Sequence, residues 1–272
     1  MYLLAVLGNL TITTLVCLVS QLHTPMYFFL CNLSVQDIVY VSTVMPNLLV
    51  TTITGDTSIS FTSCLKQIYF FGLCIITEFS LLTTMAYDRY VAICIPLNYP
   101  LIMNKMTCIL LATSSWLLGG IISLTLTMMM TKLSFYNAQE INHFFCDLQT
   151  VLKLSCSDTT NIIMFTTICG TMLGCFPFLL ILTSYIYIIS TILKIRTSAG
   201  RQKTFSSCSS HLMVVIVFYG TSLSMNMKTK SEDSEEVDQI LSLFYIALVP
   251  ALNPLVYSLR NREVLKAMKK CF

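Results

Sequence analysis

Apolar runs of about 20 residues recur along the whole chain, and a helix of that length crosses a hydrocarbon core of roughly 30 Å. The composition agrees with this pattern, because hydrophobic residues make up 55% of the chain and charged residues only 11%. A soluble domain usually carries about 25% charged residues. The chain is therefore predicted to be an integral membrane protein.

The apolar runs are too long for the strands of a membrane barrel, which are near ten residues each. Helices are predicted, with a shorter amphipathic helix after the last of them. The seven spans cover about 1–21, 26–52, 61–93, 107–130, 159–193, 203–226 and 237–258, and the C-terminal helix covers about 260–271. The predicted fold class is an all-α membrane protein, a single seven-transmembrane helix bundle across residues 1–272.

Lysine and arginine favour the cytoplasmic ends of membrane helices. One set of connections is rich in them and includes Lys105, Lys194, Arg196, Arg201, Lys203, Arg260, Arg262, Lys266, Lys269 and Lys270. The other set mixes fewer lysines with acids. This bias predicts an extracellular N-terminus and a cytoplasmic C-terminus. The net charge of +3 reflects that topology, and since no basic stripe is present, no nucleic-acid partner is expected.

Five motifs mark the predicted helices, one within the first helix and four at helix ends. They are Gly8-Asn9, LHTPMYFFL at 22–30, MAYDRYVAIC at 85–94, KTFSSCSSHL at 203–212 and PALNPLVYSLRN at 250–261.

In these motifs the chain resembles, over its whole length, the vertebrate olfactory (odorant) receptors, a branch of the rhodopsin-like G-protein-coupled receptors. The resemblance implies a rhodopsin-like bundle in the plasma membrane that binds a small, mostly apolar, neutral odorant. It also implies activation of a stimulatory, olfactory-type heterotrimeric G protein, which raises cyclic AMP. No enzyme is expected, because the chain has no HExxH, no GxSxG and no glycine-rich phosphate loop.

The inner end of the third predicted helix carries adjacent opposite charges, which are costly in a membrane unless they are paired or reach water. The resemblance implies that Asp88 holds Arg89 at rest and that Arg89 later meets the G protein. The alternative is an interfacial arginine that anchors the helix. The switch set implied by the resemblance is Asp88, Arg89, Tyr90, Tyr185, His211, Asn253, Pro254 and Tyr257. His211 could instead be a hydrogen-bonded core histidine.

Two acids lie near the middle of predicted helices, where an unpaired carboxylate is expensive. Asp37 and Glu78 must therefore be paired, protonated or bound to an ion. The resemblance places them with Asn9 and Asn253 in a polar core where Na⁺ would favour the resting state. A purely structural hydrogen-bond cluster is the alternative. No other cofactor is expected.

Most of the twelve cysteines fall in helices, where a thiol behaves as a small apolar side chain. The resemblance implies that Cys64 and Cys146 form a disulfide between the third helix and the outer loop. Tyr136 stands where the family often has the first cysteine of a second bridge. Cys156 is therefore expected to be unpaired.

The ligand site implied by this architecture lies between the outer halves of helices three, five, six and seven. Apolar walls with a few hydroxyl, amide and phenol groups suit a small neutral ligand. The expected lining is Ile68, Phe71, Gly72, Ile75, Ile76, Cys169, Leu173, Tyr219, Ser222, Met225, Asn226 and Ile246.

Two alternative functions follow from other features. The family normally has a polar extracellular N-terminal segment with a glycosylation sequon, and here the first helix starts at residue 1, so a truncated receptor with poor surface delivery or no function is one alternative. The other is a transporter that uses Asp37 and Glu78 as an ion path. Transporters usually show repeated halves with broken helices, and no such repeat is visible in the sequence.

Overall fold

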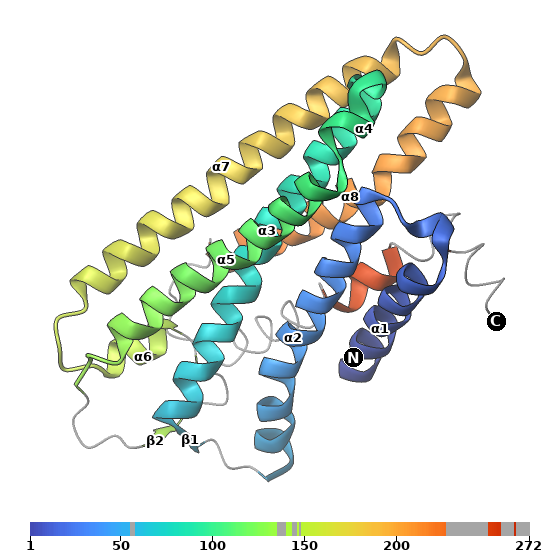
Figure 1. Cartoon of the computed structure of the whole chain (residues 1–272). Helices are drawn as coiled ribbons and strands as arrows, with labels where there is room; N and C mark the ends of the chain where they lie inside the picture. The colour runs from blue at the N-terminus through green and yellow to red at the C-terminus, as the bar shows by residue number, and fades with distance from the viewer. Residues whose placement is uncertain are drawn as a thin grey trace.

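The computed structural model is a bundle of long helices (Figure 1). The structure describes residues 1–54, 58–134, 140–142, 146, 148–226, 250–256 and 264. The six main helices are α1 (Tyr2–Leu18), α2 (Pro25–Thr54), α3 (Phe61–Cys94), α5 (Lys105–Met130), α7 (Thr160–Leu193) and α8 (Ser198–Asn226). Residues 250–256 are also helical. The predicted all-α fold class is confirmed.

Short elements connect these helices. They are η1 (Ser20–Leu22), β1 (Ser58–Ser60), η2 (Pro96–Asn98), α4 (Tyr99–Ile102), β2 (Glu140–Asn142) and α6 (Leu148–Leu154). The strands β1 and β2 form one antiparallel pair in which Ile59 lies opposite Ile141. This pair joins the start of α3 to the loop that follows α5.

Among the described residues, four helices are long and apolar enough to cross a membrane, namely α2, α3, α5 and α7. α8 would be a fifth such span and bends by 43° between Ser206 and Cys208, while α1 is a shorter apolar helix. Large apolar side chains stand on the outside of α7, where Met172 is 66% and Phe176 63% exposed. Such a surface is unfavourable in water and suits contact with lipid chains.

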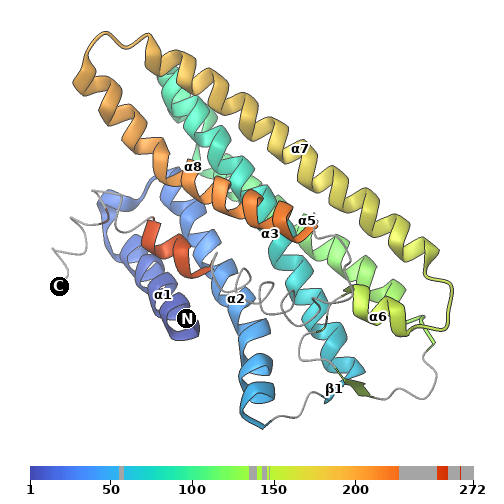
Figure 2. The ribbon, with the colours of Figure 1, turned by 180° about the vertical axis from the view of Figure 1, so that it is seen from behind.

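The central helix is α3, which packs against α2, α5, α7 and α8, while α1 packs against α2 (Figures 1 and 2). Its side chains Leu81, Leu82 and Met85 are fully buried in the main apolar cluster. Residues on α3 can therefore contact several other helices, so a change at α3 can alter the packing of each of them.

Small residues bring α3 and α5 close together. A Cβ atom added at Gly119 would stand 2.6 Å from the Thr77 hydroxyl and 2.8 Å from the Leu73 carbonyl. One at Gly72 would stand 2.8 Å from the Ser123 hydroxyl. Membrane helices commonly approach through small residues in this way. Gly72 thus lies at a helix contact.

The helix ends differ from the predicted ones by a few residues, and local capping explains part of this. α5 begins at Lys105 because the Asn104 side chain accepts a hydrogen bond from the Thr107 amide at 2.9 Å. α1 ends at Leu18, before the turn of η1 leads into α2. Of the predicted seventh helix, the structure describes residues 250–256. The predicted C-terminal helix lies outside the described residues except for Val264.

Candidate functional site: the switch and the polar core

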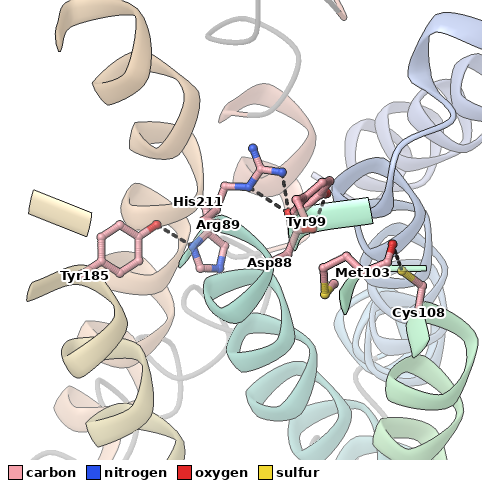
Figure 3. A network of polar contacts seen from close by, with 7 residues as sticks. All are labelled: Asp88, Arg89, Tyr99, Met103, Cys108, Tyr185 and His211. Atoms are coloured by element: carbon pink, nitrogen blue, oxygen red, sulfur yellow. Dashed lines mark hydrogen bonds and ion pairs between the residues drawn. The ribbon is translucent and has the colours of Figure 1, made fainter. Parts of the chain in front are cut away.

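A buried carboxylate near the C-terminal end of α3 is held by two partners (Figure 3). Asp88 Oδ2 accepts hydrogen bonds from Arg89 Nε, at 2.9 Å, and from Arg89 Nη2. Its Oδ1 accepts one from the Tyr99 hydroxyl at 2.8 Å. Asp88 is fully buried and the Arg89 side chain is 14% exposed. The predicted pairing of the two adjacent charges is therefore present.

Tyr99 was not identified from the sequence. It begins α4, in the connection after α3, and lies eleven positions beyond Asp88. Burial, followed by the neighbouring Asp88 carboxylate, raises the pKa of the Tyr99 phenol above its usual range. The phenol therefore keeps its proton and remains a hydrogen-bond donor to Asp88.

A second contact joins α3, α7 and α8 one layer deeper. His211 is fully buried, and its Nε2 lies 3.1 Å from the Leu82 carbonyl. Its Nδ1 lies 2.7 Å from the Tyr185 hydroxyl (Figure 3). Because a carbonyl only accepts, Nε2 must carry a proton, and in the neutral ring Nδ1 then accepts from Tyr185. The Tyr185 oxygen is also 3.2 Å from the Cys208 carbonyl. His211 thus tethers α8 to α3 and α7.

Tyr90 does not join either contact. Its ring packs edge-on against Tyr187 of α7, with ring centroids 5.9 Å apart. Tyr257, the remaining tyrosine of the predicted switch, lies outside the described residues.

The two mid-helix acids lie in a buried polar core between α1, α2, α3 and the helix at 250–256. Asn253 Nδ2 donates to Asp37 Oδ2 at 2.9 Å, and Gln36 Nε2 donates to Glu78 Oε2 at 3.3 Å. Asn9 Nδ2 donates to the carbonyls of Ala5 and Pro250 at 3.0 and 3.1 Å. The structure therefore joins Asp37 to Asn253, pairs Glu78 with Gln36, which was not predicted, and bonds Asn9 to the backbone at the start of the helix at 250–256.

Four oxygen atoms of this core are buried and lack a hydrogen-bond partner among the described residues. They are Asn9 Oδ1, Gln36 Oε1, Asp37 Oδ1 and Glu78 Oε1. Within the same part of the chain, no three His, Cys, Asp or Glu side chains gather as a metal cluster. These four atoms are oxygens of two carboxylates and two side-chain amides, and oxygen ligands of this kind suit hard cations better than soft transition metals.

Cys64 and Cys146 form a disulfide, with Cα atoms 5.3 Å apart. It ties the start of α3 to the loop beside β2. Both cysteines are buried with Ile68 and Met130 in a small apolar cluster. Cys156 is a free, exposed thiol, as expected.

The predicted ligand-lining residues of α3 have different neighbours. Ile68 packs in the cluster around the disulfide, and Phe71 stacks on Tyr40 of α2 with ring centroids 5.4 Å apart. Ile75 packs on the apolar cluster that contains Tyr40, and Gly72 faces α5. Ile76 is half-buried. The α3 side chains therefore spread over contacts with α2, α5 and α7.

On the other helices, Cys169 and Leu173 of α7 and Ser222 of α8 are half-buried. The Tyr219 ring packs against Phe79, Phe178 and Phe218, with centroids 5.1 to 5.8 Å apart. Its hydroxyl is buried and has no hydrogen-bond partner among the described residues. Met225 and Asn226 end α8, and their side chains lie outside the described part of the chain, as does Ile246.

A separate groove of about 230 Å³ lies between α1 and the helix at 250–256. Its walls are almost wholly apolar and consist of Leu4, Leu7, Gly8, Thr11, Ile12, Leu15, Ala251, Pro254 and Leu255. None of the predicted ligand-lining residues belongs to it, although Pro254 of the switch set does.

Comparison with known proteins agrees with this geometry. The family model described as olfactory receptor matches residues 1–272. Human olfactory receptor 13F1 is 45% identical over 270 residues, which cover 99% of this chain and 85% of the relative. Gorilla olfactory receptor 1G1 is 45% identical over 272 residues, covering 99% and 86%. Human olfactory receptor 1N1 is 47% identical over 273 residues, covering 100% and 88%.

Identity at this level over nearly the whole chain confirms the resemblance found in the five motifs. It does not favour the transporter or the non-functional receptor. The chain belongs to the olfactory receptor family, and it is an odorant-sensing G-protein-coupled receptor, a multi-pass membrane protein and not an enzyme.

Proposed function

We propose that this receptor binds a small, neutral, mostly apolar odorant in the outer half of its bundle and then activates a stimulatory G protein, so that cyclic AMP rises. The observation that carries this proposal is the Tyr219 hydroxyl, which is buried beside three phenylalanine rings and has no hydrogen-bond partner among the residues that the structure describes. A buried polar group normally has a hydrogen-bond partner. An odorant oxygen supplies one, and the aromatic rings bury its apolar part.

Tyr219 and His211 lie eight positions apart on α8, which is about two helical turns. A ligand that pulls on Tyr219 therefore acts on the same rigid element that His211 tethers to Leu82 and Tyr185. Movement of α8 breaks these two contacts and frees Tyr185 to turn inward. The ligand shifts the equilibrium only by its difference in affinity between the tethered and the released state.

In this proposal, release of α8 also breaks the resting pair between Arg89 and Asp88. An arginine freed at the inner end of α3 presents five donors in a planar fork, which suits carbonyl and carboxylate groups of a protein partner. In this proposal that partner is a G protein of the stimulatory type.

The disulfide supports the proposed orientation. Cys64 and Arg89 lie near opposite ends of α3, which has 34 residues and spans the bilayer. Disulfides persist in oxidising compartments and are rare in the cytosol. The disulfide and the arginine and lysine bias thus both support the proposal that the Cys64 end of α3 lies outside the cell and the Arg89 end inside. In this proposal the receptor lies in the plasma membrane with an extracellular N-terminus and a cytoplasmic C-terminus.

In the resting state the polar core is proposed to hold Na⁺ through Asp37, Glu78, Asn9 and Asn253, with Gln36 as a further ligand. The unpartnered oxygen atoms of four of these residues support it. A bound cation would offset the negative charge of the two buried carboxylates and so stabilise the resting packing of the helices around the core.

The test is an odorant screen in cells that express the receptor, with surface expression and cyclic AMP measured together. The matched variant is Tyr219→Phe, which removes one unpartnered hydroxyl and keeps the ring packing. Its stability should be unchanged, while the potency of odorants that carry an oxygen should fall about three- to tenfold. Receptors that reach the surface and signal only through a G protein that does not raise cyclic AMP would contradict the proposal, as would potencies unaffected by this variant for every agonist.

A further inference from the structure

Gln67 on α3 has a free hydrogen-bond donor inside the bundle. The residue is only 2% exposed. Its Oε1 lies 3.5 Å from Asn47 Nδ2 of α2, while its Nε2 is buried and has no partner in the part of the chain that the structure describes. Leaving an amide N–H pair without a partner costs free energy, since water satisfies it in the unfolded chain. Such a group indicates a ligand or a water that completes it.

The place of Gln67 connects it to the proposed odorant site. It lies three positions after Cys64, at the outer end of α3, and four positions before Phe71. Residues four apart share one face of a helix. Phe71 stacks on Tyr40 of α2, with the two rings inclined by 27°. The amide therefore stands one turn outward from an aromatic surface on the α2 side of the bundle.

The chemistry of Gln67 Nε2 indicates which ligand group it can bind. Because Gln67 Oε1 already faces the Asn47 amide, the remaining group is a donor only, and it matches a ligand acceptor. Lys66, the neighbouring cation on α3, is exposed and stands apart from the buried amide. A neutral amide donor without a cation suits a neutral acceptor better than a carboxylate, whose burial would need a counter-charge.

We propose that Gln67 Nε2 donates a hydrogen bond to the carbonyl oxygen of a neutral ketone, aldehyde or ester odorant, and that Asn47 positions this amide. The inference rests on the proposed odorant binding within the bundle and adds a specificity-determining residue to it. In this proposal Tyr219 of α8 and Gln67 of α3 each supply one polar contact to the ligand. Tyr219 can accept as well as donate, so selection for a carbonyl depends on Gln67.

The experiment uses the full-length receptor and a pair of ligands for each carbonyl agonist found in the screen. The second ligand is the methylene analogue, in which CH2 replaces C=O on the same carbon skeleton. In the wild type the carbonyl member should be the more potent. In Gln67→Met, which keeps the length of the side chain and loses both donors, the carbonyl member should lose about three- to tenfold in potency and the analogue should be unchanged.

Asn47→Ala is the second variant and leaves Gln67 in place. It frees Gln67 Oε1, so the amide can rotate, and the preference for the carbonyl member should fall while the response to the analogue persists. Surface expression is measured for each variant. Gln67→Met also removes the oxygen that accepts from Asn47 Nδ2, so the potencies of the two ligands are compared within each variant at its measured surface expression.

Three results would overturn the inference. They are a wild type that responds to odorants without distinguishing the two members of a pair, a Gln67→Met receptor in which both members lose potency equally, and one in which neither does. In all three cases the receptor still signals in response to odorants, so these results would not contradict the proposed function. A wild type at the cell surface that raises no cyclic AMP with any odorant counts instead against the proposed function.

Discussion

The Tyr99 hydroxyl donates a 2.8 Å hydrogen bond to Oδ1 of Asp88, the carboxylate whose other oxygen is bound by Arg89. The bond links the inner end of α3 to the first residue of α4. A carboxylate that is fully buried needs both contacts, since a single unpaired lone pair in this position is costly. Tyr99 therefore holds Asp88 in the orientation that restrains Arg89.

The first prediction is that Tyr99→Phe raises ligand-free signalling. Loss of the hydroxyl removes about 0.5–1.5 kcal/mol from the resting arrangement, so the active population should rise roughly three- to tenfold while it remains small. Cyclic AMP is measured without odorant at matched surface expression. Tyr90→Phe is the control, because Tyr90 makes its described contact through its ring, and its basal signal should equal that of the wild type. Equal basal signals in all three receptors would show that Tyr99 does not restrain the switch.

The second prediction concerns Arg89 itself. Arg89→Ala should leave the receptor folded and at the surface but abolish the cyclic AMP response, because no other side chain replaces the guanidinium fork at the inner end of α3. The comparison is with Arg89→Lys, which keeps the charge and loses the planar geometry, and which should retain only part of the response. A normal response from Arg89→Ala at equal surface expression would remove the central step of the proposed mechanism.

The third prediction concerns the cysteines at the outer face. The disulfide between Cys64 and Cys146 closes a sequence separation of 82 residues, which corresponds to about 4 kcal/mol on chain-entropy grounds. Cys64→Ser should therefore lose most surface expression, whereas Cys156→Ser should leave it unchanged because Cys156 is a free, exposed thiol. Peptide mapping under non-reducing conditions checks the pairing directly. Recovery of a bridge between Cys146 and Cys156 would contradict it.

Sequence patterns with strong physical constraints predicted the long apolar helices and the buried charged groups. A helix that crosses a membrane must be long and apolar, so α2, α3, α5 and α7 were visible as runs of hydrophobic residues. A charged pair in such a helix must be satisfied, so Asp88 and Arg89 were visible too. Asp37 and Glu78 stood out for the same reason, and the structure places both in one polar core.

Contacts between helices could not be predicted in the same way. Gly72 was expected to line the ligand site, but its added Cβ would meet Ser123 of α5, and which face of α3 meets α5 depends on packing. Tyr99 and Gln67 were missed because a phenol in a short helix and an amide in a long one carry no local signal. Tyr99 is recognised only once the chain after α3 turns back to Asp88, and Gln67 only because its Nε2 has no partner among the described residues.

The last prediction concerns the polar core. If Na⁺ binds there, raising external Na⁺ should lower ligand-free signalling of the wild type, because the ion stabilises the resting arrangement. Asp37→Asn should remove this dependence, since the amide is neutral and attracts a cation far less than a carboxylate does. Gln36→Leu is the graded variant, because Gln36 supplies one unpartnered oxygen and no charge, and it should weaken the dependence without removing it. Basal cyclic AMP is measured as Na⁺ is replaced by a large organic cation at constant ionic strength, so that general screening stays the same. A wild type whose basal signal does not change with Na⁺ would mean that the four residues of the core form a structural hydrogen-bond cluster, with the unpartnered oxygens of Asp37 and Glu78 satisfied by protons.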